Sequence, residues 1–193
     1  MEYAELKALW QYALSMLYKK DRRLLRYNVH ERTIACRLAL YLQLKYDPCF
    51  MKRACIDVEY NREGKEIKRP YIDSESGWIA PDIILHERDN QENNIFYCEV
   101  KKKSKNNNDD AIRVKNALRG KRSYEYGINL YSLTSKEANL SFYKLDGLHI
   151  IEEEFYFDAK EKQLKSQLNT NKTWIYKDNK WEEISSLMLY VKI

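Results

Sequence analysis

Two short apolar runs with charged side chains at or next to one end constrain the fold of this chain most strongly. The run from Ile95 to Val100 is rich in aromatic and β-branched residues, which is typical of a strand. Glu99 lies within this run and Lys101 follows it, so the two side chains share one face of the strand. Burying a carboxylate or an ammonium group is unfavourable unless the groups are paired or take part in chemistry. The run therefore predicts a strand whose end carries an ion pair or a reactive centre.

A second carboxylate precedes the other apolar run. Asp82 follows Pro81 and opens the run from Ile83 to Leu85. The polar segment from His86 to Asn94 has the length of a β-hairpin loop, so we expect the two runs to pair as neighbouring strands. The hairpin would bring Asp82 beside Glu99.

Pro81-Asp82 followed by Glu99-Val100-Lys101 resembles the motif of the PD-(D/E)xK nuclease superfamily, whose fold many restriction and DNA-repair endonucleases share. The resemblance covers about residues 28–133. It implies a restriction-endonuclease-like αβββαβ core, which is an α/β fold with a mixed central sheet flanked by helices. It also implies that Asp82 and Glu99 bind Mg²⁺ or Mn²⁺ while Lys101 positions or activates the attacking water. Such an ion prefers oxygen ligands and lowers the pKa of its bound water.

A third acid is expected upstream. The segment from Asn28 to Lys45 carries apolar residues at helical spacing, and Glu31 lies on the same face as that stripe. In this superfamily, an N-terminal helix often contributes a further metal-binding glutamate. In this sequence, Glu31 is the residue that matches that glutamate. Asn28 and Glu31 also have the spacing of a capping box, in which Glu31 would serve only the helix N-terminus. Both interpretations stand on the sequence alone.

Basic residues gather directly after Glu99. Positions 101–122 hold nine Lys or Arg residues and two acidic ones, although the whole chain has a net charge of only +5. Lys101 lies beside Lys102 and Lys103, and this crowding predicts a lowered pKa for Lys101. A basic cluster suits contacts with phosphate groups, although a solvated helix face gives the same pattern. We assign nucleic-acid contacts to Lys103, Lys105, Arg113, Lys115 and Arg119.

These features predict a divalent-metal-dependent nuclease that hydrolyses phosphodiester bonds of nucleic acid. The favoured substrate is DNA, which would make the protein an endodeoxyribonuclease. The alternative is a non-catalytic module that binds nucleic acid or protein on a nuclease-like fold. An ion pair on an edge strand would also account for Glu99 and Lys101. A protein partner or a homodimer is left open. His30 and His86 lie near the expected site in sequence, but lone histidines more often have no such role.

Composition favours one domain over residues 1–193, with the nuclease-like core at about 28–133 and a C-terminal β extension at about 140–193. No apolar run approaches the ~18 residues of a membrane span, so we expect no membrane association and a cytoplasmic location. Four cysteines lie at spacings that suit neither zinc nor a disulfide framework, and we expect reduced, largely buried thiols. They are Cys36, Cys49, Cys55 and Cys98.

Further elements complete the expected order. Helices are predicted at about Tyr3 to Lys19 and Asp109 to Arg119, and strands at about Ala54 to Asn61 and Tyr126 to Leu133. Alternation in the strand from Ala54 places Asp57 and Glu59 towards solvent. Gly127 would allow a close approach to the last of these strands. Beyond Leu140 we expect short aromatic-rich strands, with Asp178-Asn179 as a hairpin turn.

Overall fold

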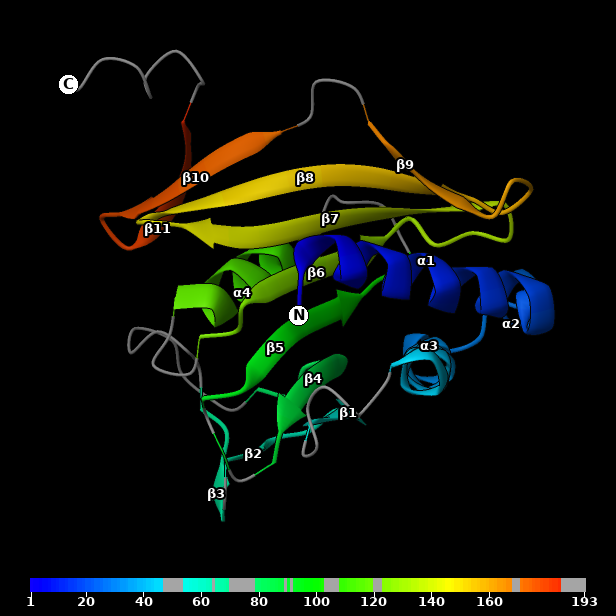
Figure 1. The fold of residues 1–193 in the computed structure, drawn as a ribbon, viewed down its shortest axis with the longest axis horizontal. Coiled ribbons are helices and arrows are strands. Elements are labelled where there is room, and N and C mark those ends of the chain that lie inside the picture. Colours follow the sequence, from blue (N-terminus) through cyan, green and yellow to red (C-terminus); the bar gives the residue numbers. More distant parts are fainter. Residues whose placement is uncertain are drawn as a thin grey trace.

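The chain is built around one long, mixed β-sheet (Figure 1). The computed structural model describes residues 1–46, 54–63, 65–69, 79–88, 90, 92–102, 108–119, 123–167 and 171–184. In these ranges the helices are α1 (Tyr3–Lys20), α2 (Arg22–Arg26), α3 (Glu31–Lys45) and α4 (Asn108–Arg119). The strands are β1 (Ala54–Val58), β2 (Arg62–Glu63), β3 (Glu66–Ile67), β4 (Ile83–Glu87), β5 (Asn94–Val100), β6 (Tyr126–Tyr131), β7 (Glu137–Asp146), β8 (His149–Asp158), β9 (Gln163–Ser166), β10 (Lys172–Lys177) and β11 (Lys180–Ile184).

The strand order of the sheet is β1-β4-β5-β6-β7-β8-β10-β11, with β9 also paired to β8. In Figure 1 it runs from β1 and β4 at the bottom to β8 and β10 at the top. Among the described strands of this sheet, only β5 and β6 pair in parallel, because α4 carries the chain back between them. The predicted α/β class with a mixed sheet is confirmed, and most of the pairings are antiparallel.

Helices cover both faces of the central strands. α1 and α3 pack on the face that carries Phe96 and Leu130, and the ring of Trp10 meets Phe96 edge to face at 5.8 Å. α4 packs on the other face, against Tyr97 and Tyr143. Alternate residues of β5 therefore enter two separate cores, which explains why its apolar run is nearly continuous.

Gly127 sets how closely α4 approaches the sheet. A Cβ atom at this position would lie 2.4 Å from Cγ1 of Val114 and 2.7 Å from Cδ1 of Leu118. Any side chain at this position would force Val114 and Leu118 to shift. The predicted close approach at Gly127 is confirmed.

The C-terminal strands are longer than the sequence suggested. β7 and β8 have 10 residues each and continue the central sheet beyond β6. The aromatic-rich region is thus part of the same sheet. Asp178 and Asn179, with φ of 50° and 61°, form the predicted turn between β10 and β11.

The start of α3 differs from the expected capping box. His30 is the N-cap, and its Nδ1 accepts a hydrogen bond from the Arg32 backbone N–H at 3.2 Å. Asn28 has a φ of 53° and lies in the connection before the helix, so the capping-box interpretation is wrong. Glu31 is instead the first helical residue, and its side chain is available to other partners.

Two smaller expectations are also settled. Cys36 is exposed, Cys55 half-buried and Cys98 buried, so burial of the thiols was only partly foreseen, while Cys49 lies outside the described residues. Asp109 lies in the first turn of α4, which begins at Asn108. Within the described ranges, no helix combines the length and the apolar character that crossing a membrane requires.

Candidate metal centre

The hairpin of β4 and β5 places Asp82 opposite Glu99. Ile83 pairs with Cys98 in the antiparallel register, so Asp82 and Glu99 take the next opposed positions. The backbone N–H of Val100 donates a hydrogen bond to Oδ2 of Asp82 at 2.7 Å, which fixes this carboxyl group at the end of β5. The sequence pattern thus located both carboxyl groups in space.

Burial makes this carboxyl pair difficult to ionise. Glu99 is only 6% exposed. That burial and the neighbouring charge of Asp82 raise the pKa of Glu99 to about 8, against opposing effects of Arg113 and of the Tyr97 hydroxyl, which donates to Oε1. Burial likewise raises the pKa of Asp82, although the Val100 hydrogen bond opposes it. Two neighbouring carboxyl groups with raised pKa values do not readily carry negative charges at the same time, and a divalent cation between them would stabilise both charges. Their oxygen atoms are therefore suitable ligands for Mg²⁺ or Mn²⁺.

Lys101 links the pair to α3. Its Nζ lies 3.3 Å from Oε2 of Glu31 and 3.9 Å from Oδ2 of Asp110. Partial burial acts to lower the pKa of Lys101, but the carboxylates of Asp110 and Glu31 outweigh it and raise this pKa. The predicted lowering is wrong, because the charges facing the ammonium group are negative.

Glu31 has both carboxylate oxygens engaged at the end of β5. Oε1 accepts a hydrogen bond from the Lys102 backbone N–H at 2.9 Å, and Oε2 receives Lys101. The Lys102 side chain turns away and donates to the backbone oxygen of Asn28 at 3.1 Å. Lys102 therefore anchors the connection before α3, while Lys101 faces the acids.

α4 contributes two residues to this site, of which the sequence predicted a functional role only for Arg113 and none for Asp110. Asp110 is 2% exposed, and its carboxylate pairs with the guanidinium of Arg113 one turn later. Nε of Arg113 also lies 3.4 Å from Oε1 of Glu99. A helical signal existed, because Asp110 has the i, i+4 spacing to the buried Val114. Arg113 was expected at a phosphate and is found between two carboxylates.

Two of the other predicted nucleic-acid contacts lie in described residues, and their environments differ. Lys115 is 1% exposed, and its Nζ lies 3.3 Å from the ring centroid of Trp174. β10 and β11 cover this side of α4, so Lys115 does not lie on an exposed face as its predicted nucleic-acid contact requires. Arg119 is exposed and stacks on Tyr176 at 4.9 Å. Lys103 and Lys105 lie outside the described residues.

A second polar cluster joins β1 to β4 at the sheet edge. Ligand atoms of Cys55, Asp57 and His86 all lie within 4.8 Å of one another. Nε2 of His86 lies 3.0 Å from Oδ2 of Asp57, and Nε of Arg88 donates to the same oxygen at 2.8 Å. Although burial alone raises it, the hydrogen bonds of Arg88 and His86 hold the pKa of Asp57 well below its usual range. These residue types suit zinc, but Arg88 already neutralises the carboxylate.

Asp57 does not face solvent, contrary to the sequence expectation. Its side chain is 14% exposed, because His86, Arg88 and Lys68 share this face of the sheet edge. The ring of Tyr60 packs on His86 at 4.6 Å. Burial lowers the pKa of Lys68 to about 8, partly offset by Asp57, and its Nζ donates to the Tyr124 hydroxyl at 3.3 Å. Glu59 is bound by Arg32.

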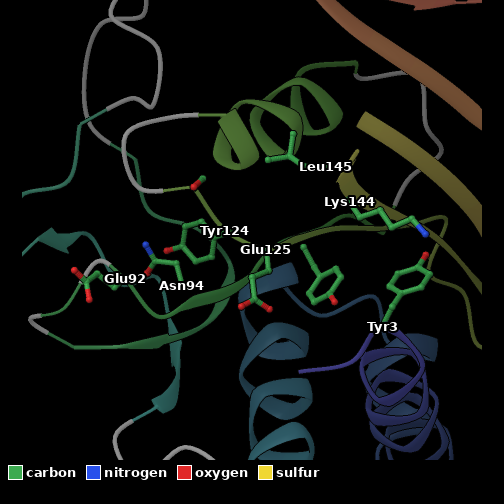
Figure 2. A pocket seen from close by; sticks show the side chains of 9 residues that line it. Tyr3, Glu92, Asn94, Tyr124, Glu125, Lys144 and Leu145 are labelled. Atoms are coloured by element: carbon green, nitrogen blue, oxygen red, sulfur yellow. The ribbon is translucent and has the colours of Figure 1, made fainter. Parts of the chain in front are cut away.

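A hollow of ≈ 510 Å³ lies at the opposite end of the central strands (Figure 2). It is bordered by Asn94 and Tyr126, which begin β5 and β6, whereas Glu99 lies near the end of β5. Tyr3, Tyr124 and Lys144 line it from other elements. The hollow is therefore separate from the carboxyl pair.

The carboxyl site gathers groups of complementary chemistry from α3, the start of β4, the end of β5 and α4. Searches of protein-family models, of curated proteins and of solved structures find no protein that this chain matches. Function is consequently inferred from side-chain chemistry. The carboxyl site consists of the acids Glu31, Asp82, Glu99 and Asp110 and the cations Lys101 and Arg113.

Proposed function

We propose that this protein is a divalent-metal-dependent nuclease with a restriction-endonuclease-like core, and that it hydrolyses phosphodiester bonds in DNA. One observation carries the proposal: the coupled, buried carboxyl groups of Asp82 and Glu99 lie beside Lys101 at the end of a central strand. Apart from β2 and β3, which form a separate two-stranded sheet, the elements follow the order α3, β1, β4, β5, α4, β6. This order supports the proposed core, since the resemblance implies the same one. Arg119 offers an exposed charge for phosphate contact.

Each site residue has a separate task in this proposal. Asp82 and Glu99 would hold the metal ion, which when bound lowers the pKa of its water and polarises a phosphate oxygen. Lys101 keeps its proton at neutral pH, because neighbouring carboxylates raise its pKa. It therefore donates hydrogen bonds to a phosphate oxygen and does not accept the proton of the attacking water.

Glu31 orients Lys101. Its two oxygens receive Nζ of Lys101 and the backbone N–H of Lys102, so metal coordination by Glu31 would require one of these hydrogen bonds to open. Coordination by Glu31 stays a prediction of the family resemblance. Arg113 balances Glu99 and Asp110 in the absence of metal, and a bound cation would release it towards substrate phosphate.

Cleavage of plasmid DNA and of oligonucleotides in Mg²⁺ or Mn²⁺ tests the proposal, with EDTA as the metal-free reference. We expect Asp82→Ala and Lys101→Met each to reduce the rate by roughly 10²-fold or more. Asp109→Ala and Lys136→Met remove exposed charges of the same types and should cleave as the wild type does. Cleavage that survives both Asp82→Ala and Lys101→Met would overturn the site assignment.

A non-catalytic nucleic-acid-binding module is the second candidate. It is favoured by one observation, which is that both cations of the site already pair with carboxyl groups of the protein, Lys101 with Glu31 and Arg113 with Glu99. Fluorescence anisotropy with labelled DNA distinguishes the two candidates. Binding that weakens with salt, together with no cleavage in either metal, would favour the module.

A further inference from the structure

Asn129 on β6 lies beside Glu99 on the same face of the sheet. The parallel register pairs Glu99 with Asn129 and Tyr97 with Gly127. Neighbouring strands are about 4.8 Å apart, so paired side chains on one face are in direct reach of each other. Asn129 is therefore the β6 side chain directly beside Glu99.

The amide oxygen of Asn129 is buried without a partner. The residue is 3% exposed, and its Oδ1 accepts no hydrogen bond among the described residues. Buried polar groups in folded proteins nearly always have a partner, because an unpaired one keeps the cost of its desolvation. The proposed function assigns Glu99 to a metal ion, and a buried, unpaired oxygen beside Glu99 can serve as a further ligand of that ion.

The chemistry of the amide suits this position. Asn carbonyl oxygens are hard ligands that Mg²⁺ and Mn²⁺ accept. An amide is also neutral, so it adds a ligand without adding a further negative charge to the acids of the site. An aspartate here would instead increase the repulsion that already acts on Glu99.

We propose that Oδ1 of Asn129 is a neutral oxygen ligand of the same divalent ion that Asp82 and Glu99 hold. This inference rests on the proposed function. It assigns to β6 a metal-binding role in addition to its pairing with β5. Asn129 thus joins the strand after α4 to the hairpin that carries the acids.

Titration calorimetry with Mn²⁺ tests the inference on the full chain. We expect Asn129→Leu and Asn129→Ala to weaken Mn²⁺ binding about 10- to 100-fold. The matched control is Asn94→Leu, which changes another buried asparagine at the far end of β5 and should keep the wild-type affinity. Glu99→Gln marks the site, because it should abolish binding there.

Thermal unfolding in EDTA provides a readout besides metal binding. Asn129→Leu removes an unpaired buried oxygen, so its Tm without metal should equal or exceed that of the wild type. A lower Tm together with Mn²⁺ affinity within twofold of wild type would show a structural role and overturn the inference. If wild type binds no Mn²⁺ in a Glu99-dependent manner, the proposed function fails and the inference with it. Binding that depends on Glu99 but not on Asn129 overturns the inference alone.

Discussion

Nζ of Lys101 lies 3.3 Å from Oε2 of Glu31, and this contact joins the end of β5 to the first residue of α3. The two residues are far apart in sequence, and the helix and the strand belong to different layers. The contact therefore determines where the ammonium group points. It also shows that Lys101 is held by carboxylates on both sides, since Asp110 lies 3.9 Å away.

A double-mutant cycle measures this pair. Glu31→Gln and Lys101→Met should show a coupling energy of about 0.5–1 kcal/mol in urea unfolding without metal, because the pair is partly exposed. Glu31→Gln keeps an oxygen for the Lys102 N–H, so the cycle isolates the ion pair. Glu31→Gln combined with Lys136→Met should be additive, and equal coupling in both cycles would contradict the assignment.

Glu99 makes the stability of the metal-free protein fall with pH. Its pKa is raised from 4.5 to about 8 on folding, so the folded state binds more protons than the unfolded state between these pH values. Stability from this group is complete below pH 4.5 and is lost as pH rises through about 8. Glu99→Gln should remove the effect. Urea unfolding in EDTA should show the variant gaining on wild type from pH 5 to 9, and a constant difference would refute the assignment.

Lys68 should have the opposite pH dependence. Burial lowers its pKa from 10.5 to about 8, so the unfolded state binds more protons between these values and stability rises with pH. One pKa unit corresponds to about 1.4 kcal/mol, so Lys68→Met should stabilise the protein at pH 7 by up to about 3 kcal/mol. The gain should vanish near pH 10.5. Lys136→Met, at an exposed position, is the control, and an equal gain there would contradict this explanation.

Gly127→Ala should destabilise the fold by about 1–3 kcal/mol through overpacking. The added Cβ would meet Val114 and Leu118 at 2.4 and 2.7 Å. Combining it with Val114→Ala should recover part of the loss, because that removes the closest atom. Thermal unfolding of the single and double variants provides the measurement. Full stability of Gly127→Ala would mean that α4 lies farther from β6.

Local patterns predicted the hairpin and the positions of Asp82, Glu99 and Lys101 well. Period-two alternation assigns side chains to faces of a strand, and the loop length specifies the pairing. The same alternation correctly separated Asp57 from Ile56. It did not tell what covers the second face, and this is why Asp57 was expected in solvent.

Contacts between segments that are distant in sequence account for the features that the sequence did not predict correctly. Lys115 was assigned to phosphate because it belongs to a basic cluster of the sequence, but the tryptophans of β10 and β11 pack over its ammonium group. Asn129 carries no local signal, because its role follows from the parallel register with Glu99. His30 replaces Asn28 as N-cap because the backbone at Asn28 turns with positive φ.

The cover over Lys115 also bears on the order in which the protein is synthesised. A ribosome completes Asp82, Glu99 and Lys101 well before Trp174 and Trp181. Until the hairpin of β10 and β11 emerges, Lys115 lacks the tryptophan ring that packs on its ammonium group. Asn116 also lacks the hydrogen bond from the Trp181 indole at 2.7 Å. Domains generally fold as units once their segments are available. A nascent chain would therefore contain all the acids of the carboxyl site before β10 and β11 can pack on α4.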